Sequence, residues 1–238
     1  MDPMHQWDVS RIKDATTRRS LLRALAAGGA GLAFAGLSAG PTKAASDVSL
    51  ERFTTLALTA EMLSVTFYSN AIAAANQLVI SGADLAFLKA THAAEQDHVT
   101  VFQLLGGQPL TNTFSLPAGA ATFSDRGAFV QTILALETAS VGAYMTAVLL
   151  FAGGGRADLA QLAARIGSVE GEHRVLARRL AGLAPANDRS IEDNPYSSLE
   201  DLAAKVQGAG FFGPQPGNSF TYPGPVAIDA SGVSYRHP

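Results

Sequence analysis

Apolar residues recur at steps of three and four along most of the chain between residues 47 and 181. This spacing places apolar side chains on one face of a helix, where they can pack against other helices. Four segments carry the pattern, and we expect helices at 47–75, 84–105, 125–152 and 156–181. Glycine follows directly after each of the last three segments, as expected where helices end.

The connections between these helices are short, long and short. Residues 76–82 and 153–155 join the helices within each pair, whereas residues 106–123 separate the two pairs. A helix of about 24 residues is about 36 Å long, and about 18 extended residues reach up to about 60 Å. The middle connection can therefore run the length of a bundle. Two antiparallel hairpins joined by one long crossover predict an all-α, ferritin-like four-helix bundle.

Polar residues near the starts of two helices are candidate caps. Asp47 or Ser49 is expected to cap the first helix, and Ser124 or Asp125 the third. Beyond residue 185, only residues 197–207 have a helical pattern, which predicts a short fifth helix.

From residue 208 onward, Gly, Pro and aromatic residues dominate without periodicity. We expect an irregular tail that packs on the bundle or on a second subunit, or is disordered at its end. The sequence therefore leaves open whether the protein forms a homo-oligomer.

Glutamates stand at matching places in the first and third helices. Glu61 and Glu137 are each followed by Ser, Val and Tyr at offsets of three, four and seven residues. The residues one turn away from each glutamate on the same face are mostly apolar. We therefore expect both glutamates to point into the bundle.

The second and fourth helices each carry the motif Glu-x-x-His, at 95–98 and at 170–173. The two motifs begin 34 and 33 residues after the inward glutamates. Within each motif the Glu and the His share a helix face. Asp97 and Glu172 lie about 200° away from the motif glutamates, at about 100° per residue, and are expected to face solvent.

Four buried carboxylates would repel one another strongly unless they were neutralised. Two divalent cations balance the four charges, and two neutral imidazoles complete the ligand set. A single glutamate on a helix is more often a surface residue than a ligand, but the doubled motif matches the di-iron or di-manganese pattern of four-helix bundles. The predicted ligands are Glu61, Glu95, His98, Glu137, Glu170 and His173.

Residues 52–181 resemble the ferritin-like domain family found in exported bacterial proteins and in plant desiccation-related proteins. The segments that carry the resemblance are LALTAEMLSVTFYSNAI, AAEQDHVTVFQLLGG, ALETASVGAYMTAV and EGEHRVLARRLAG. More distantly, the ligand pattern is similar to bacterioferritin, rubrerythrin and manganese catalase. The resemblance implies two Fe or Mn ions held by the six residues, with Glu95 and Glu170 as the bridging pair.

Three departures narrow the choice among these better-known relatives. The chain has no cysteine, so the four-cysteine iron site of rubrerythrin-type peroxidases cannot form, and disulfides and iron–sulfur clusters are excluded as well. Gln96 occupies the position where bacterioferritin has its haem-ligating methionine, so we do not expect haem. The Pro/Gly-rich tail does not favour an iron-storage cage.

Three further residues are candidates for contacts with the ligands. Tyr68 and Tyr144 lie two turns from Glu61 and Glu137. They are expected either to hydrogen-bond the ligands or donate an electron, or to be ordinary core tyrosines. His92 lies one turn before the second helix's motif; a helix-surface position is favoured, with contact to the site as the alternative. Ser64 and Ser140 are expected to be packing residues.

The N-terminus has the pattern of an export signal. Arg18 and Arg19 are followed by leucines and by an apolar, glycine-rich run over residues 24–39. We expect a twin-arginine signal peptide over residues 1–45, cleaved after Ala44 or Ala45, and a periplasmic or extracellular protein. A retained membrane anchor is the alternative, although the run is short for one. The bundle would then occupy residues 46–185 and a C-terminal extension residues 186–238.

Composition limits the range of functions. The chain has 238 residues, 47% of them hydrophobic, and a net charge of −3. The body of the chain has no basic cluster, so no nucleic-acid partner is expected. Expected partners are the twin-arginine export machinery and a small oxidant, dioxygen or peroxide. The alternatives are a non-enzymatic stress or desiccation protein with a structural or vestigial metal site, and a partner-binding surface formed by the apolar helices and the aromatic tail.

Overall fold

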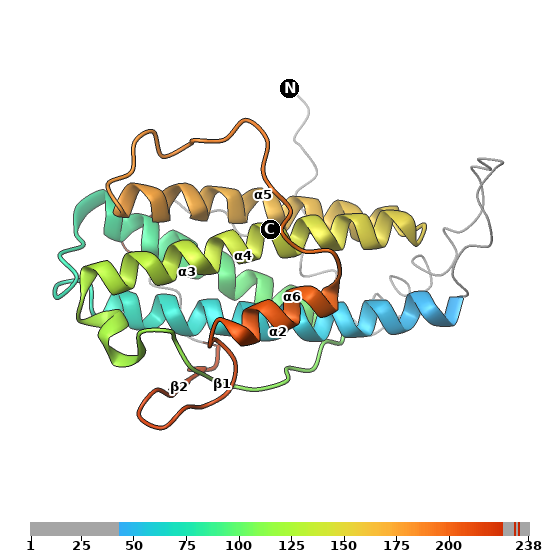
Figure 1. The fold of residues 1–238 in the computed structure, drawn as a ribbon, viewed down its shortest axis with the longest axis horizontal. Helices are drawn as coiled ribbons and strands as arrows, with labels where there is room; N and C mark the ends of the chain where they lie inside the picture. Colours follow the sequence, from blue (N-terminus) through green and yellow to red (C-terminus); the bar gives the residue numbers. More distant parts are fainter. Residues whose placement is uncertain (1–42, 226–230, 232, 234–238) are drawn as a thin grey trace.

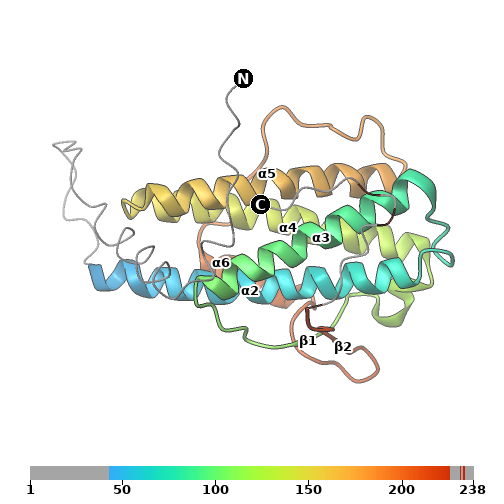
Figure 2. The same ribbon diagram turned by 180° about the vertical axis from the view of Figure 1, so that it is seen from behind.

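The computed structural model describes residues 43–225, 231 and 233. Four long helices lie side by side along one axis (Figure 1): α2 (Lys43–Ala73), α3 (Gly82–Leu104), α4 (Arg126–Gly153) and α5 (Ala157–Leu180). The α2–α3 and α4–α5 pairs are antiparallel hairpins, and the chain between the pairs runs back along the bundle (Figure 2). This arrangement confirms the predicted all-α bundle with one long crossover.

The helix boundaries differ from the prediction mainly at the first helix. α2 begins at Lys43, four residues before the predicted start, so neither Asp47 nor Ser49 stands at its N-cap. The residues Lys43 to Ala45 are good helix formers, which allows the helix to extend further toward the N-terminus. At α4, the Asp125 carboxylate accepts a hydrogen bond from the Ala128 amide at 2.7 Å, so Asp125 rather than Ser124 is the cap. Residues 1–42 of the predicted export signal lie outside the described residues, and its last three residues, 43–45, form the start of α2.

The crossover between α3 and α4 is held by the C-terminal tail. It contains strand β1 (Thr113–Phe114) and the short 3₁₀ helix η2 (Gly119–Phe123). Strand β2 (Phe220–Thr221) pairs antiparallel with β1. The Asn218 side chain accepts from the Leu116 amide at 3.0 Å and donates to the Leu116 carbonyl at 2.7 Å. The described part of the tail therefore packs on the bundle's crossover, and its two-residue strands are too short to show a period in the sequence.

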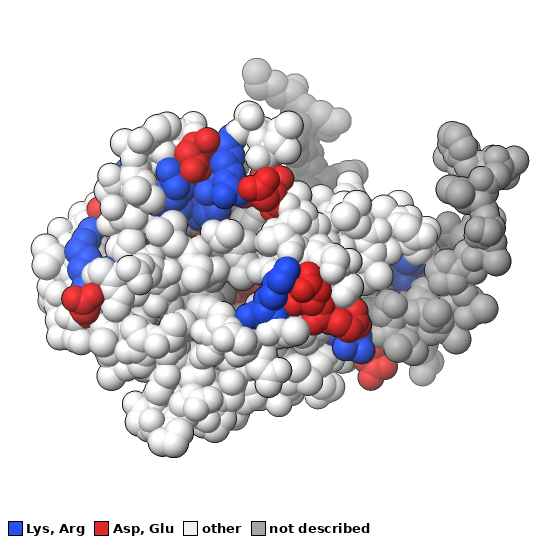
Figure 3. Space-filling model, in the orientation of Figure 1, with Lys and Arg blue, Asp and Glu red and all other residues white. Residues whose placement is uncertain are grey.

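The predicted fifth helix is α6 (Leu199–Gly208), which lies across α2 and α4. The Ser198 hydroxyl caps it by accepting from the Asp201 amide at 3.2 Å. Leu199 is buried, and the Arg52 guanidinium on α2 lies 3.3 Å from the Glu200 carboxylate. On the face drawn in Figure 3, charged side chains form separate groups of mixed sign, one of them along α6.

Gly142 explains how the segment before α6 approaches α4. A Cβ atom at Gly142 would lie 2.7 Å from the Tyr196 ring and 2.9 Å from Pro195. Thr66 occupies the corresponding place in the first repeat. The two repeats therefore differ where the extension docks, and only the second repeat leaves room for it.

α4 is the one helix within the described residues that is long and apolar enough to cross a membrane, judged by length and composition alone. It lies in the bundle, packed against α5, and carries the buried Glu137. Its apolar character is also that expected of a core helix.

Candidate metal centre

Six side chains from all four long helices meet inside the bundle. α2 contributes one glutamate, α4 another, and α3 and α5 each contribute a glutamate and the histidine one turn later. None of the six is more than 7% exposed. They are the residues predicted as ligands: Glu61, Glu95, His98, Glu137, Glu170 and His173.

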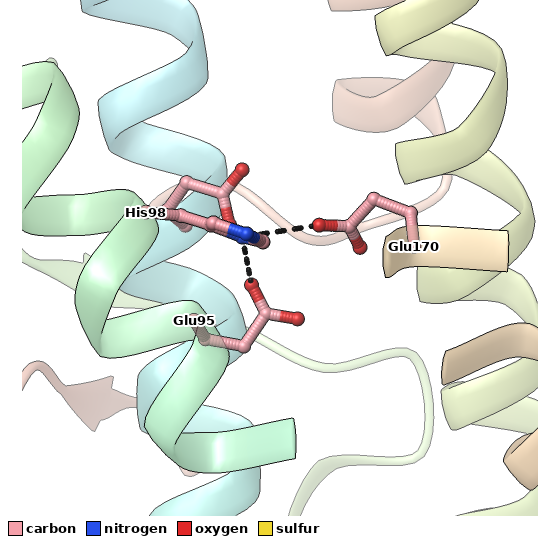
Figure 4. A group of neighbouring side chains, drawn as sticks. Glu95, His98 and Glu170 are labelled. Carbon is pink, nitrogen blue, oxygen red and sulfur yellow. Dashed lines mark hydrogen bonds and ion pairs between the residues drawn. The ribbon is translucent and has the colours of Figure 1, made fainter. Parts of the chain in front are cut away.

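One half of the cluster surrounds His98. Its Nδ1 atom lies 3.4 Å from Glu95 Oε2 and 3.2 Å from Glu170 Oε1 (Figure 4). The same nitrogen lies 3.5 Å from Glu61 Oε2. These four residues can each present one ligand atom within 4.8 Å of the others.

The other half surrounds His173 in the same way. Its Nδ1 atom lies 3.0 Å from Glu95 Oε1 and 3.5 Å from Glu170 Oε2. Glu137 Oε2 lies 3.7 Å away. Glu95 and Glu170 therefore direct one oxygen to each histidine, which is the arrangement needed for carboxylates that bridge two ions.

The donor atoms fit a pair of cations. Glu95 Oε1, Glu137 Oε2, both Glu170 oxygens and His173 Nδ1 are buried and make no hydrogen bond within the described residues, and each lies within 4 Å of an oppositely charged atom of the same cluster. Buried polar atoms without partners are costly. Carboxylate oxygens with imidazole nitrogens are a ligand set suited to divalent iron or manganese. The residues present therefore fit a dinuclear centre.

Burial acts strongly on the carboxyl groups of the metal-free cluster. Desolvation raises the pKa values of Glu61 and Glu137 well above the ordinary value of 4.5, and repulsion from neighbouring glutamates adds to the effect. Burial also acts to raise the pKa of Glu95, but contacts with His173 and His98 outweigh it and lower that pKa. The two outer glutamates therefore retain protons more readily than the bridging Glu95.

The pKa values of the two imidazoles are raised, whereas those of buried histidines in apolar surroundings are lowered. Burial alone would lower their pKa values, but contacts with Glu170 and the other carboxylates raise the pKa values of His98 and His173 well above 6.5. The metal-free cluster therefore holds protons that bound cations would displace.

The two tyrosines are paired across the hairpins. The Tyr68 hydroxyl on α2 donates to Glu137 on α4, and the Tyr144 hydroxyl on α4 donates to Glu61 on α2. Burial and the nearby glutamates raise both tyrosine pKa values well above 10.0, which keeps the hydroxyls protonated as donors. Of the two interpretations left open by the sequence, the structure shows hydrogen bonds to the carboxylates. The crossed pairing was not predicted, because it depends on how α2 and α4 are aligned.

The surface position favoured for His92 is wrong. His92 is 6% exposed, and its Nε2 atom lies 2.9 Å from the Ser69 hydroxyl on α2. Burial lowers its pKa from 6.5. α2 covers this side of α3, and a single helix's pattern does not reveal which of its faces a neighbour covers.

The residues inside the two motifs differ in exposure. Glu172 is exposed, as predicted, whereas Asp97 is half-buried. The neighbouring Gln96 is also buried, and its amide nitrogen lies 3.4 Å from the Tyr222 hydroxyl. This side of α3 is therefore covered by the C-terminal tail, which the sequence did not predict.

One of the comparisons with known proteins supports the fold. Residues 51–183, more than half of the chain, match the model of the ferritin-like domain family. The chain therefore belongs to this family. No curated protein and no solved structure gives a significant match to the chain.

The crossed tyrosine contacts predict a role in metal affinity. Replacing Tyr68→Phe or Tyr144→Phe removes the donor to one outer glutamate and leaves that carboxylate oxygen unpaired. We expect affinity for Mn²⁺ or Fe²⁺ to fall by about 10–100-fold, as is typical when a hydrogen bond to a metal ligand is lost. Anaerobic calorimetric titration measures the change, with Tyr196→Phe as a control away from the centre. Equal affinities in the three variants would contradict this role.

The raised pKa values predict how stability depends on pH. The native imidazoles keep protons that the unfolded chain loses above about pH 6.5, so the native state binds more protons and metal-free stability falls as pH rises. The raised pKa values of Glu61 and Glu137 also make metal-free stability fall as pH rises, from about pH 4.5 upward. We expect a loss of about 1–3 kcal/mol between about pH 6.5 and 8.5.

Urea unfolding with a chelator measures this loss, and the same series with Mn²⁺ provides the comparison. The stability gained from the metal should grow over the same interval, because binding displaces protons. A metal-free stability that stays level or rises with pH would show that the imidazoles are neutral in the native state.

Proposed function

We propose that this protein binds a pair of iron or manganese ions and reacts with dioxygen or peroxide. The observation that carries the proposal is the geometry of Glu95 and Glu170, each of which directs one oxygen to each of the two histidines. The family match over residues 51–183 supports it. When bound, such a pair of ions supplies electron transfer and polarises the oxidant.

The chain's own residues would hold and shield this centre. Glu95 and Glu170 would bridge, while Glu61 and Glu137 would complete the two ends. Each outer glutamate presents one oxygen toward a histidine and receives a tyrosine hydrogen bond on the other oxygen. The tyrosines thereby orient the outer carboxylates, and burial of all six donors excludes bulk water.

A structural role is the second candidate, and the depth of the site favours it. All six donors are at most 7% exposed, and they join all four long helices. Bound ions would then lock the bundle in a stress or desiccation protein without turnover. A ligand that binds only the native state stabilises it, by about 2.7 kcal/mol when the free ligand concentration is about 100 times the Kd.

We also propose export through the twin-arginine pathway to the periplasm or beyond. The motif at Arg18 and Arg19 and the apolar run that follows support this. The pathway carries folded proteins, so the metal would be inserted before export. This order matters because copper or zinc outcompetes manganese and iron at equilibrium.

Metal content and turnover test the proposed centre. Glu170→Gln removes one bridging carboxylate, so we expect metal to fall from about two ions per chain to well under one. Glu172→Gln changes an exposed residue two positions away on the same helix and should keep the metal. Elemental analysis of both variants, isolated after native export, measures the difference.

Oxygen and peroxide consumption by the metal-loaded protein separates the two functions. Metal with turnover supports the enzyme, whereas metal that raises the melting temperature without turnover supports the structural role. Equal metal content in the two variants would overturn the centre itself.

Export is tested by replacing the arginine pair. Arg18→Lys with Arg19→Lys should abolish export and leave the precursor in the cytoplasm, because this pathway reads the two arginines. Cell fractionation followed by immunoblotting measures the distribution, with Arg11→Lys as the matched control upstream of the motif. Unchanged export of the double variant would exclude the twin-arginine route.

A further inference from the structure

A cavity of about 60 Å³ lies between α2, α4 and α6. Half-buried residues are part of its lining, among them Ala139 and Ala143 on α4 and Ala203 on α6. The buried Glu61 and Tyr144, which are hydrogen-bonded to each other, also line it. The cavity is therefore lined both by half-buried residues beside α6 and by one of the outer glutamates of the candidate metal centre.

The cavity exists because its walls are made of small residues. α2 contributes Ala57, Ala60 and Ser64, and α4 contributes Ala139, Ser140 and Ala143. Ser64 and Ser140, predicted as packing residues, are the repeated serines of the two motifs and face this space. The remaining walls are aliphatic and aromatic side chains, so the lining is largely apolar.

Size and lining together define the occupant. A buried water needs two to four polar partners, and an engineered apolar cavity of about 150 Å³ remains dry and binds benzene or xenon. The present cavity of about 60 Å³ is smaller and offers few polar groups. It suits a neutral apolar molecule of a few atoms and not an ion or a long chain.

α6, which closes one side of this cavity, is a feature of this chain's extension. The family match ends at residue 183, whereas α6 begins at Leu199. Leu199, Leu202, Ala203 and Val206 of α6 line the cavity. The extension therefore gives the Glu61 side of the cluster an apolar wall that the matched region does not contain.

We propose that the cavity beneath α6 is a binding site for a small, neutral, apolar molecule. Binding there requires no metal and depends on the space between α6 and the two helices. One consequence rests on the proposed function: dioxygen, which is apolar, would reach the Glu61 side by this route, whereas hydrogen peroxide, which is polar, would not be favoured in it.

Xenon is the probe for the site, because it is apolar and of suitable size. Methyl NMR spectra of the metal-free protein under xenon pressure should show saturable shifts at Leu63, Leu136 and Leu202, which line the cavity. Ala203→Leu fills the cavity from α6 and should weaken these shifts at least tenfold. Ala204→Leu makes the same change at the exposed neighbouring position and should leave them intact.

The outcomes are distinct. Absence of saturable shifts in the unaltered protein, or equal shifts in the two alanine variants, would overturn the proposal. Leu202→Ala provides a second test without filling the cavity: it should enlarge the site and tighten benzene binding, and unchanged benzene binding would count against the site. Because these measurements use metal-free protein, they succeed or fail independently of the dinuclear centre.

The dioxygen route is tested on the metal-loaded protein. Ala203→Leu should slow dioxygen consumption and leave peroxide consumption near that of Ala204→Leu. Equal slowing of both reactions would overturn the selective route while leaving the xenon site intact.

Discussion

The structure depends on placing four carboxylates and two imidazoles in one buried cluster. Each of the six is at most 7% exposed, so water cannot screen the repulsion among Glu61, Glu95, Glu137 and Glu170. Two ways of balancing the charge are open to the same residues. In the metal-free protein, the raised pKa values of the outer glutamates and of the imidazoles favour protons on these groups. In the loaded protein, cations would balance the charge. Because the ligand residues come from all four helices, holding them around the cations would also fix the helices relative to one another.

The internal repeat makes the donor set symmetrical, but the surroundings of the two halves differ. Each tyrosine crosses to the glutamate of the other hairpin, so the hairpins are joined by matching hydrogen bonds. The extension packs on one side, where Gly142 leaves room for Tyr196 and the first repeat has Thr66 instead. α6 then encloses an apolar cavity against Glu61. The ligand set is therefore symmetrical, but only its Glu61 end lies beside this cavity.

Much of the fold could be predicted because it depends on local periodicity. The four long helices, the crossover, the short fifth helix and the inward direction of Glu61 and Glu137 follow from residue spacing along single helices. The errors fall where a segment meets a distant one. His92 was placed at the surface, yet α2 covers it through Ser69. Asp97 was expected to face solvent and is half-buried, on the helix where the tail's Tyr222 contacts Gln96. The start of α2 was missed for a different reason, because helix propensity extends beyond the amphipathic pattern.

The sequence by itself determined the helices, their order and the six candidate ligands, because each motif lies within a few turns of one helix and repeats at a fixed offset. Only the tertiary structure decided which oxygen faces which imidazole, which glutamate each tyrosine contacts, and where α6 and the tail dock. These depend on the alignment and rotation of helices that are far apart in the chain. The spacing of residues along one helix carries no information about its register against another, so the bridging geometry and the apolar cavity exist only in the packed bundle.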